Sequence, residues 1–263
     1  MNITTFLISL TPPIVRKVIR AVRLRIKKYH GQWKIDQKIE KYINYNDGYY
    51  VELGAVDGIG LSNTLYYELN RNWGGILVEP VPHNFVKCLA NRSNVRNKIF
   101  CNACVSFEYK DKFVEMVYAH YMSTAVGLDS DIPDPVAHAE SGQRFLATTS
   151  EKLFKFGAVA VPLNELLEKA NAPKMIDLLS LDVEGAELEV LKGIDHRIYR
   201  FKLMCVESRD PARITNYLKA FDYELIDQIS PHDYLYICKD YKVSLQKDDQ
   251  ITFAEKSSQA LRD

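Results

Sequence analysis

From residue 49 onward, short apolar runs alternate along the chain with segments whose apolar residues recur at helical spacing. The first half of this pattern predicts strands at residues 49–54, 75–79 and 98–105 and helices at residues 62–69 and 82–91. Ser62 is the expected N-cap of the first helix, and Pro82 suits the first turn of the second. Alternation of this kind is typical of βαβ units and predicts a mainly parallel sheet.

The alternation is interrupted between residues 107 and 162 and then resumes. The interruption contains two strand-like runs, at 113–119 and 158–161, separated by a polar segment at 121–149. That segment predicts a long loop with room for one helical turn, and we expect such a loop to close over a substrate. The resumed pattern predicts helices at 163–170, 185–192 and 211–221 and strands at 176–183, 201–207, 223–229 and 234–238. The last two strands form the expected antiparallel hairpin that closes a doubly wound α/β sheet.

The N-terminal part of the chain has a different character. Residues 14–28 contain seven basic residues and no acidic one, and their apolar residues form a stripe at helical spacing. This basic amphipathic helix either packs on protein or lies on an anionic membrane surface, with peripheral contact through residues 5–28. We therefore expect three parts, namely an N-terminal helical extension at 1–46, a catalytic-type domain at 47–240 and a C-terminal tail at 241–263.

Composition and charge narrow the class of protein. Apolar residues make up 47% of the chain and charged residues 26%, which is ordinary globular usage. The formal net charge is zero, so no nucleic-acid partner is expected. The five cysteines are an odd number, no secretory signal with a cleavage site is visible, and Cys101-x-x-Cys104 lacks the second ligand pair of a zinc site. Reduced thiols in the cytoplasm are the expectation, with the inner face of the membrane as a second location.

A glycine-rich turn follows the first predicted strand. It reads Glu52-Leu-Gly54-Ala-Val-Asp57-Gly58, and a helix is predicted directly after it. Glycines let the backbone approach a bound ligand closely, and such ligands lie at the carboxyl ends of parallel strands. The turn matches neither the phosphate loop nor the GxGxxG dinucleotide turn. Its acidic residue would repel a pyrophosphate and would suit a ligand that bears an amine or a sulfonium.

Carboxylates also end the other predicted strands. Glu79 ends the second strand, where related nucleotide sites place the carboxylate that binds the ribose hydroxyls. Asp182 and Glu184 end a buried apolar strand, where an isolated charge would be costly, and Glu207 ends the neighbouring strand. We expect these carboxylates to converge at one edge of the sheet. Glu187, in the first turn of a helix, is explained by the helix dipole alone.

These three segments resemble the FkbM-type methyltransferase family. The family pattern runs acid-x-Gly-Ala-x-x-Gly, then a strand ending in Glu-Pro, then Asp-x-Glu-Gly-x-Glu before a Leu-Lys-Gly helix end. This chain has Glu52 to Gly58, Glu79-Pro80, and Asp182 to Glu187 followed by Leu191-Lys192-Gly193, in that order within residues 48–240. One departure is Val56, where the family often has Asn.

The resemblance implies a class I methyltransferase fold and S-adenosylmethionine as methyl donor. Glu52 would then bind the methionine end of the donor, and Glu79 would bind its ribose. Gly54 and Gly58 would let the backbone approach the donor closely. Asn102 is expected near the adenine and Asp182 near the methyl group. The remaining residues expected around the donor are Asp57, Ser62, Asn63 and Thr64.

Family members commonly methylate hydroxyls, often of sugars in glycans, glycolipids or natural products, and the resemblance implies the same for this chain. Asp182, Glu184 and Glu207 are the expected catalytic residues, with His120 and His232 as alternative bases. Mg²⁺ is a further possible cofactor, because it prefers hard oxygen ligands such as these carboxylates. Two other classes remain open: another nucleotide-dependent enzyme such as a dehydrogenase, and a non-catalytic membrane-associated module. The acceptor and the oligomeric state do not follow from the sequence.

Overall fold

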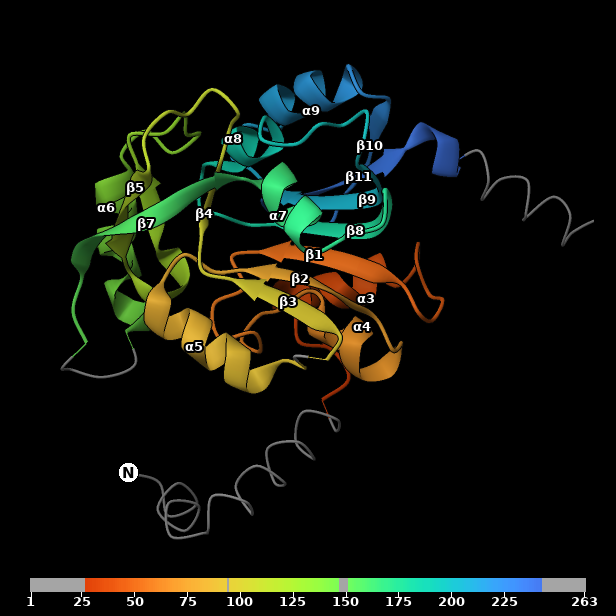
Figure 1. Ribbon diagram of the computed structural model, residues 1–263, viewed down its shortest axis with the longest axis horizontal. Coiled ribbons are helices and arrows are strands. Elements are labelled where there is room, and N and C mark those ends of the chain that lie inside the picture. Colours follow the sequence, from red (N-terminus) through yellow and green to blue (C-terminus); the bar gives the residue numbers. More distant parts are fainter. Residues whose placement is uncertain (1–26, 94, 147–150, 243–263) are drawn as a thin grey trace, which may run out of the picture.

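The computed structural model describes residues 27–93, 95–146 and 151–242. In this part of the chain, seven strands form a central sheet in the order β10-β11-β9-β8-β1-β2-β3 (Figure 1). Their bounds are Tyr49–Leu53 for β1, Gly74–Val78 for β2, Asn97–Phe100 for β3, Met175–Leu181 for β8, Arg200–Glu207 for β9, Tyr223–Gln228 for β10 and Asp233–Cys238 for β11.

Strand direction in the central sheet confirms the predicted fold class. β1 pairs in parallel with β2 and β8, and the pairs β2/β3 and β8/β9 are parallel as well. β11 is antiparallel to both β9 and β10, as the predicted closing hairpin requires. The chain moves outward from β1 to one edge and later outward from β8 to the other edge. The strand order therefore reverses between β1 and β8, and ligands of doubly wound sheets bind at the carboxyl ends beside such a point.

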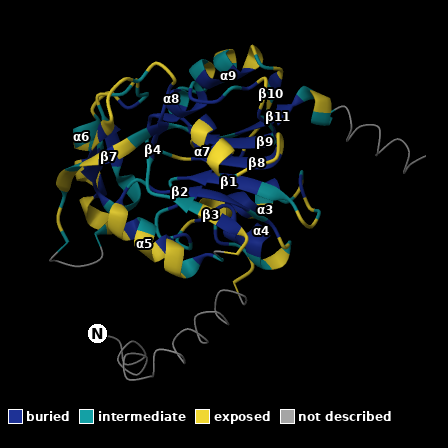
Figure 2. Ribbon diagram, in the orientation of Figure 1, coloured by how far each residue is buried: buried dark blue, intermediate teal, exposed yellow. Residues whose placement is uncertain are grey.

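Helices cover both faces of the central sheet (Figure 1). The helices α7, α8 and α9 pack on one face and form one layer. The helices α3, α4 and α5 pack on the other face and form a second layer. Their bounds are Leu163–Lys169 for α7, Glu187–Leu191 for α8, Pro211–Lys219 for α9, Ile35–Ile39 for α3, Leu65–Asn70 for α4 and Pro82–Asn91 for α5. The inner strands β1, β2 and β8 are buried along almost their whole length (Figure 2), which explains their apolar runs.

Described residues that precede the predicted division at residue 47 pack on the central sheet. Ile35, Ile39 and Ile43 are buried in the same cluster as Trp73 and the strands of the central sheet. The segment before α3 also contains the short 3₁₀ helix η1 at Gln32–Lys34. The predicted basic helix falls almost wholly on residues 1–26, which lie outside the described residues.

Two local predictions are wrong. The run at 98–105 was expected as one strand, but β3 ends at Phe100 and a separate strand, β4, covers Ala103–Val105 in another sheet. The first helix begins at Leu65 rather than directly after Ser62. The Ser62 hydroxyl still accepts hydrogen bonds from the backbone N–H groups of Thr64 and Leu65, at 3.3 and 3.1 Å. It therefore satisfies helix donors from a position just outside the helix.

The interruption after β4 builds a second sheet of four strands in the order β4-β7-β5-β6. β5 covers Phe113–Tyr118, β6 Thr124–Val126 and β7 Phe154–Pro162. The predicted long loop at 121–149 holds more structure than one turn, namely β6, the helix α6 at Pro135–Ser141 and the 3₁₀ helices η2 at His120–Met122 and η3 at Gly142–Phe145. The Asp134 side chain caps α6 by accepting from the N–H of Ala137 at 3.0 Å.

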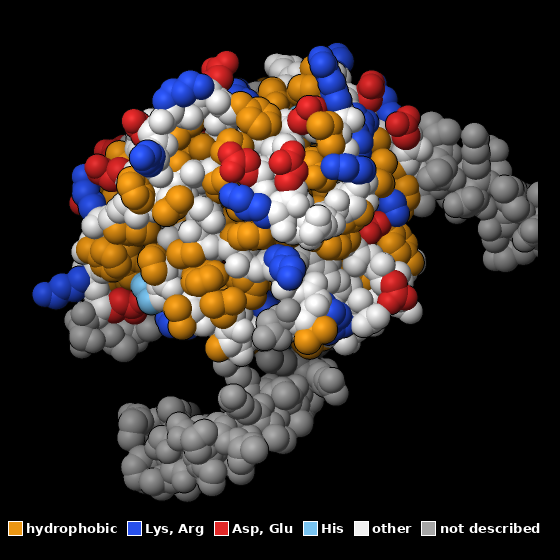
Figure 3. Space-filling model, in the orientation of Figure 1, with side chains coloured by type: hydrophobic (Ala, Val, Ile, Leu, Met, Phe, Trp, Pro, Cys, Tyr) orange, Lys and Arg blue, Asp and Glu red, His pale blue; other side chains and the backbone are white. Residues whose placement is uncertain are grey.

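Part of the surface is apolar. Val86 and Leu89 of α5 and Phe154 and Val159 of β7 are exposed, and orange side chains gather over this part of the molecule in Figure 3. Within the described residues, every helix is too short or too polar to cross a lipid bilayer.

Candidate active site

A cavity lies at the carboxyl ends of β1, β2, β8 and β9, beside the point where the strand order reverses. It encloses about 1220 Å³ of space between atoms, counting the part open to solvent. Residues of the second sheet and of η1 complete its walls. Nine of the residues expected around the donor or as catalytic carboxylates line it: Glu52, Gly54, Ser62, Asn63, Glu79, Asn102, Asp182, Glu184 and Glu207.

The glycine turn owes its shape to close packing between strands. Gly54 has φ +78°, and a Cβ atom added there would lie 1.9 Å from the backbone oxygen of Asp182. A side chain at this position would therefore push β1 and β8 apart at their carboxyl ends. Gly54 brings the two strand ends together, so the turn and Asp182 border the same cavity.

Val56 holds a conformation that its side chain disfavours. Its φ is +47°, in the left-handed region, which Asn tolerates and a β-branched residue rarely adopts. Its backbone N–H donates to Oε2 of Glu79 at 2.8 Å. This contact ties the turn to the next strand, and the left-handed φ is one that the Asn of the family pattern adopts more readily than Val.

Glu52 is the centre of a buried hydrogen-bond network. Its carboxylate accepts from the hydroxyls of Ser62 and Thr64 at 3.0 and 2.6 Å and from the N–H of Asn63 at 3.0 Å. Arg92 lies 3.3 Å from the same carboxylate, and its side chain is completely buried. Glu52 therefore shapes the segment 62–64, and much of its charge is balanced by a guanidinium.

Arg92 is a residue that the sequence analysis missed. Its Nε donates to Glu68 at 2.6 Å, and its two terminal nitrogens reach Tyr50, the Gly58 carbonyl oxygen and the Glu52 network. A single Arg after a helix carries no sequence signal of burial. Its pairing becomes visible only when α5 packs beside the carboxyl end of β1.

Glu79 lines the cavity and is only 3% exposed. Its two oxygens accept from the N–H groups of Val56 and Val81 at 2.8 and 2.9 Å. Burial away from water raises the pKa of Glu79 to about 7, although these hydrogen bonds act in the opposite direction. Each carboxylate oxygen has a second lone pair, so Glu79 keeps acceptor capacity for a ligand.

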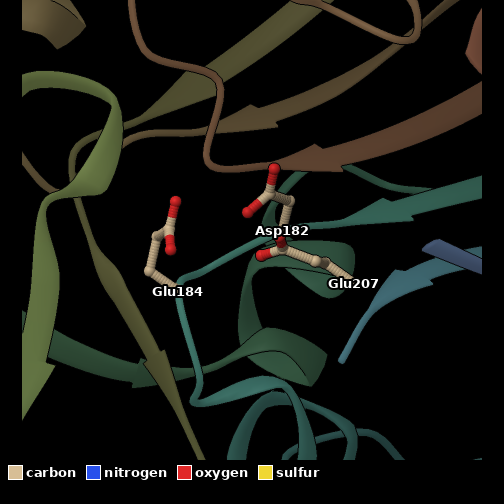
Figure 4. Close-up of side chains that lie close together, drawn as sticks. All are labelled: Asp182, Glu184 and Glu207. Carbon is tan, nitrogen blue, oxygen red and sulfur yellow. The ribbon is translucent and has the colours of Figure 1, made fainter. Parts of the chain in front are cut away.

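The three predicted catalytic carboxylates meet in the cavity. Asp182, Glu184 and Glu207 each offer an oxygen atom, and these atoms all lie within 4.8 Å of one another. Figure 4 shows the side chains of Asp182 and Glu207 close together and that of Glu184 apart from them, across a gap. Asp182 is exposed to the cavity. Desolvation by the surrounding protein, together with the charges of Glu207 and Glu184, raises the pKa of Asp182 well above its usual range.

The pair Asp182 and Glu207 has the properties of two acids that share one proton. Their carboxyl oxygens lie within 4.8 Å of each other, and their pKa values are both raised by burial and by nearby carboxylates, which favours one proton between the two. Burial also raises the pKa of Glu207 to about 7, while Arg209, with Nη1 3.7 Å from Oε2 of Glu207, acts to lower it. The pair can therefore accept one more proton near neutral pH, which suits a general base.

Arg209 bears on the question of a metal. Three carboxylate oxygens at this spacing are a possible oxygen ligand set for a divalent cation. Arg209 already places its guanidinium 3.4 Å from Glu184 and 3.7 Å from Glu207. Together with the shared proton, it offsets much of the negative charge that would attract such a cation.

Other predicted residues lie outside the cavity lining. Asp57 accepts from the N–H groups of Ile59 and Gly60 at 2.9 and 2.8 Å and thereby forms the turn. Gly58, with φ +77°, makes room for Arg92, since a Cβ atom added at Gly58 would lie 2.7 Å from Cγ of Arg92. Thr64 is buried beneath Glu52. We assign these three residues to the architecture of the site rather than to contact with a ligand.

The two predicted alternative bases differ in position. His120 lines the cavity, and burial lowers its pKa. His232 is exposed and lies outside the lining, although its neighbour Asp233 belongs to it. His138 was not considered from the sequence, yet its Nε2 lies 2.6 Å from Oε2 of Glu184. A lone His on a short helix 46 residues from Glu184 along the chain offered no signal.

The fold and this site define a class I methyltransferase-like protein, with its ligand cavity at the reversal of strand order. The family "Methyltransferase FkbM domain" matches residues 52–225, and the chain therefore belongs to the FkbM methyltransferase family. This result confirms the family resemblance and sets aside the dehydrogenase alternative.

Solved structures provide further comparisons. Methyltransferase FkbM from Methylobacillus flagellatus KT is 15% identical with a TM-score of 0.43, and the match covers 73% of this chain and 43% of that one. The chain thus spans less than half the length of that protein. TrmK from M. capricolum, solved with S-adenosyl-homocysteine, is 12% identical with a TM-score of 0.35, and the match covers 77% of this chain and 65% of that one. No curated protein matches the chain.

Proposed function

We propose that this protein transfers the methyl group of S-adenosylmethionine to a hydroxyl of a sugar in a glycan, a glycolipid or a glycosylated natural product. The observation that carries the proposal is the meeting of three carboxylates, Asp182, Glu184 and Glu207, in the cavity that the glycine turn borders. Membership of the FkbM methyltransferase family supports the transfer of a methyl group.

The cavity offers places for both substrates. Glu79 and Asn102 on one wall suit the ribose and the adenine of the donor, and Glu52 and Gly54 lie where its methionine end would reach. The same cavity continues to Asp182, Glu184 and Glu207, which gives the acceptor a place beside the donor.

The proposed reaction needs a base for the acceptor. A hydroxyl oxygen attacks the methyl carbon in line with the sulfonium, the S–CH₃ bond breaks and its electron pair stays on sulfur. The O–CH₃ bond forms, and the hydroxyl proton passes to Asp182 while the proton that the pair already holds lies on Glu207. The pair Asp182 and Glu207 can hold this proton near neutral pH and release it to water afterwards. The products are S-adenosylhomocysteine and a methyl ether.

We leave Mg²⁺ out of this proposal, because Arg209 and the shared proton supply positive charge at the cluster. Turnover in the presence of EDTA tests this point, and we expect it to be unchanged. A loss that added Mg²⁺ restores would assign the cluster to a metal.

The proposal is tested with labelled S-adenosylmethionine and a panel of sugar nucleotides, glycolipids and oligosaccharides. With the acceptor found, Asp182→Asn keeps the shape of the side chain and removes its charge. Turnover should fall by at least about 100-fold, the usual effect of losing an acid–base group. Binding of S-adenosylhomocysteine, measured by calorimetry, should change little. Normal turnover in this variant would refute the assignment of Asp182 as the base.

The location of the protein is also a proposal. Residues 5–28 carry the basic amphipathic pattern, and the apolar surface of α5 and β7 adds a second region that water disfavours. We propose peripheral contact with an anionic membrane from the cytoplasmic side. The full chain should sediment with anionic vesicles at low salt and lose this binding at high salt.

A further inference from the structure

Glu184 lies in a turn that residues of the second sheet and α6 hold from outside. The Thr124 hydroxyl donates to the Glu184 carbonyl oxygen at 2.8 Å, and the N–H of Asp131 donates to the Gly185 carbonyl oxygen at 3.0 Å. Nε2 of His138 lies 2.6 Å from Oε2 of Glu184. Three contacts from residues 124–138 therefore converge on two consecutive residues after β8.

The backbone of this turn is one that Glu184 would not choose by itself. Its φ is +57°, in the left-handed region that costs an ordinary residue about 1–2 kcal/mol. Gly185 follows with φ +106°, and an added Cβ there would lie 2.5 Å from Oγ of Ser130 and 2.9 Å from Ile132. The segment 124–138 therefore packs tightly on the turn and stabilises this conformation. Strain that the surroundings maintain is typical of functional positions.

The side chain of Glu184 is fixed from two sides. His138 contacts Oε2 from α6, and Nη2 of Arg209 lies 3.4 Å from the same oxygen. Arg209 is in turn anchored through its backbone N–H, which donates to Oδ2 of Asp131 at 2.6 Å. The side chains of Glu184 and His138 are 14% and 13% exposed, so each lies mostly within protein. Oε1 is left for the cavity that Glu184 lines.

We propose that His138 is a positioning residue, which holds the Glu184 carboxylate at the acceptor end of the cavity so that it accepts a hydrogen bond from an acceptor hydroxyl. The inference rests on the proposed methyl transfer and deepens it. Glu184 orients the acceptor and Asp182 takes the proton. The inserted segment 124–138, rather than the central sheet, then determines which acceptor fits.

Three variants test this role. His138→Ala removes the contact, His138→Gln keeps a nitrogen donor near the position of Nε2, and Glu140→Gln is a matched control on the exposed side of α6. With the acceptor found in the panel, kcat/KM for the acceptor should fall by about 10- to 100-fold in His138→Ala, because small displacements of a positioning group have effects of this size. The KM for the acceptor should carry most of the change.

The control measurements separate positioning from general damage. The dissociation constant of S-adenosylhomocysteine should stay within about twofold in all three variants. His138→Gln should recover at least half of the lost kcat/KM, and Glu140→Gln should match the wild type. Normal kcat/KM in His138→Ala overturns the proposal. So does a folded His138→Gln variant that is no better than His138→Ala.

A structural readout keeps this inference distinct from the proposed function. Crystal structures of His138→Ala and His138→Gln should show the Glu184 side chain displaced in the first and retained in the second. This comparison needs no acceptor, so it stands even if the panel yields none, an outcome that counts against the proposed function instead. An unmoved Glu184 in His138→Ala shows that His138 does not position it.

Discussion

Replacing Val56 should stabilise the protein. Val56 holds φ +47°, a conformation that costs an ordinary residue about 1–2 kcal/mol and a β-branched residue more. Asn adopts this region readily, so Val56→Asn recovers most of that cost. Val56 is only partly buried, so the change gives up part of the burial energy of two methyl groups, about 0.8 kcal/mol for each fully buried carbon. The expected net gain is about 1 kcal/mol.

Thermal and urea denaturation measure this gain. For a protein of this size, about 1 kcal/mol raises Tm by about 2–4 °C. Val56→Gly should also stabilise the protein, but less. The greater freedom of glycine in the unfolded chain costs about 0.4–1 kcal/mol of folding free energy. The expected order of stability is Asn, then Gly, then the wild type.

A matched control is Val95→Asn, since Val95 is 90% exposed. Its effect should stay within about 0.5 kcal/mol. If Val56→Asn and Val56→Gly are both less stable than the wild type while Val95→Asn is neutral, the strain argument is refuted. In that case, the packing of the Val56 side chain would stabilise the protein by more than the strain in the turn destabilises it.

Three further predictions follow from buried charges. Arg92→Met leaves two buried carboxylates unpaired and should cost about 3–5 kcal/mol in urea denaturation, whereas the exposed Arg96→Met should be nearly neutral. Burial raises the pKa of Glu187 to about 8, so the folded protein keeps a proton that the unfolded chain has lost. Stability should therefore decline as pH rises from about 5 to 8, and Glu187→Gln should gain up to about 1.4 kcal/mol per pH unit over the wild type in that window. Ribose hydroxyls favour the ionised form of Glu79, whose pKa is about 7, so calorimetry should show S-adenosylhomocysteine binding more tightly at pH 8 than at pH 6. A pH-independent dissociation constant would remove Glu79 from the ribose site.

Much of the central sheet could be predicted because its signals are local. Apolar runs and helical spacing depend on neighbouring residues in the chain, and the alternation of strands and helices implies parallel pairing. Carboxylates at the ends of parallel strands must reach the same edge of the sheet. The sequence therefore predicts that Asp182, Glu184 and Glu207 lie together, and in the structure an oxygen of each lies within 4.8 Å of the others.

The errors of prediction occur where distant segments decide the outcome. The run at 98–105 is apolar throughout, and only the second sheet, which takes Ala103–Val105 as β4, shows where the first strand ends. Asp134 and Pro135 are ordinary signals for the start of a helix, but α6 is too short for its periodicity to stand out.

The chemistry of the candidate site divides in the same way. The sequence by itself determined which carboxylates lie at the strand ends, since strand order and position along the strand settle that. Only the tertiary structure decided how each is paired. Arg92 balances Glu52 because α5 packs against the first turn, and His138 reaches Glu184 because α6 folds back over the end of β8. Pairings across such sequence distances depend on how whole elements pack, and the residues involved carry no local pattern that would reveal them.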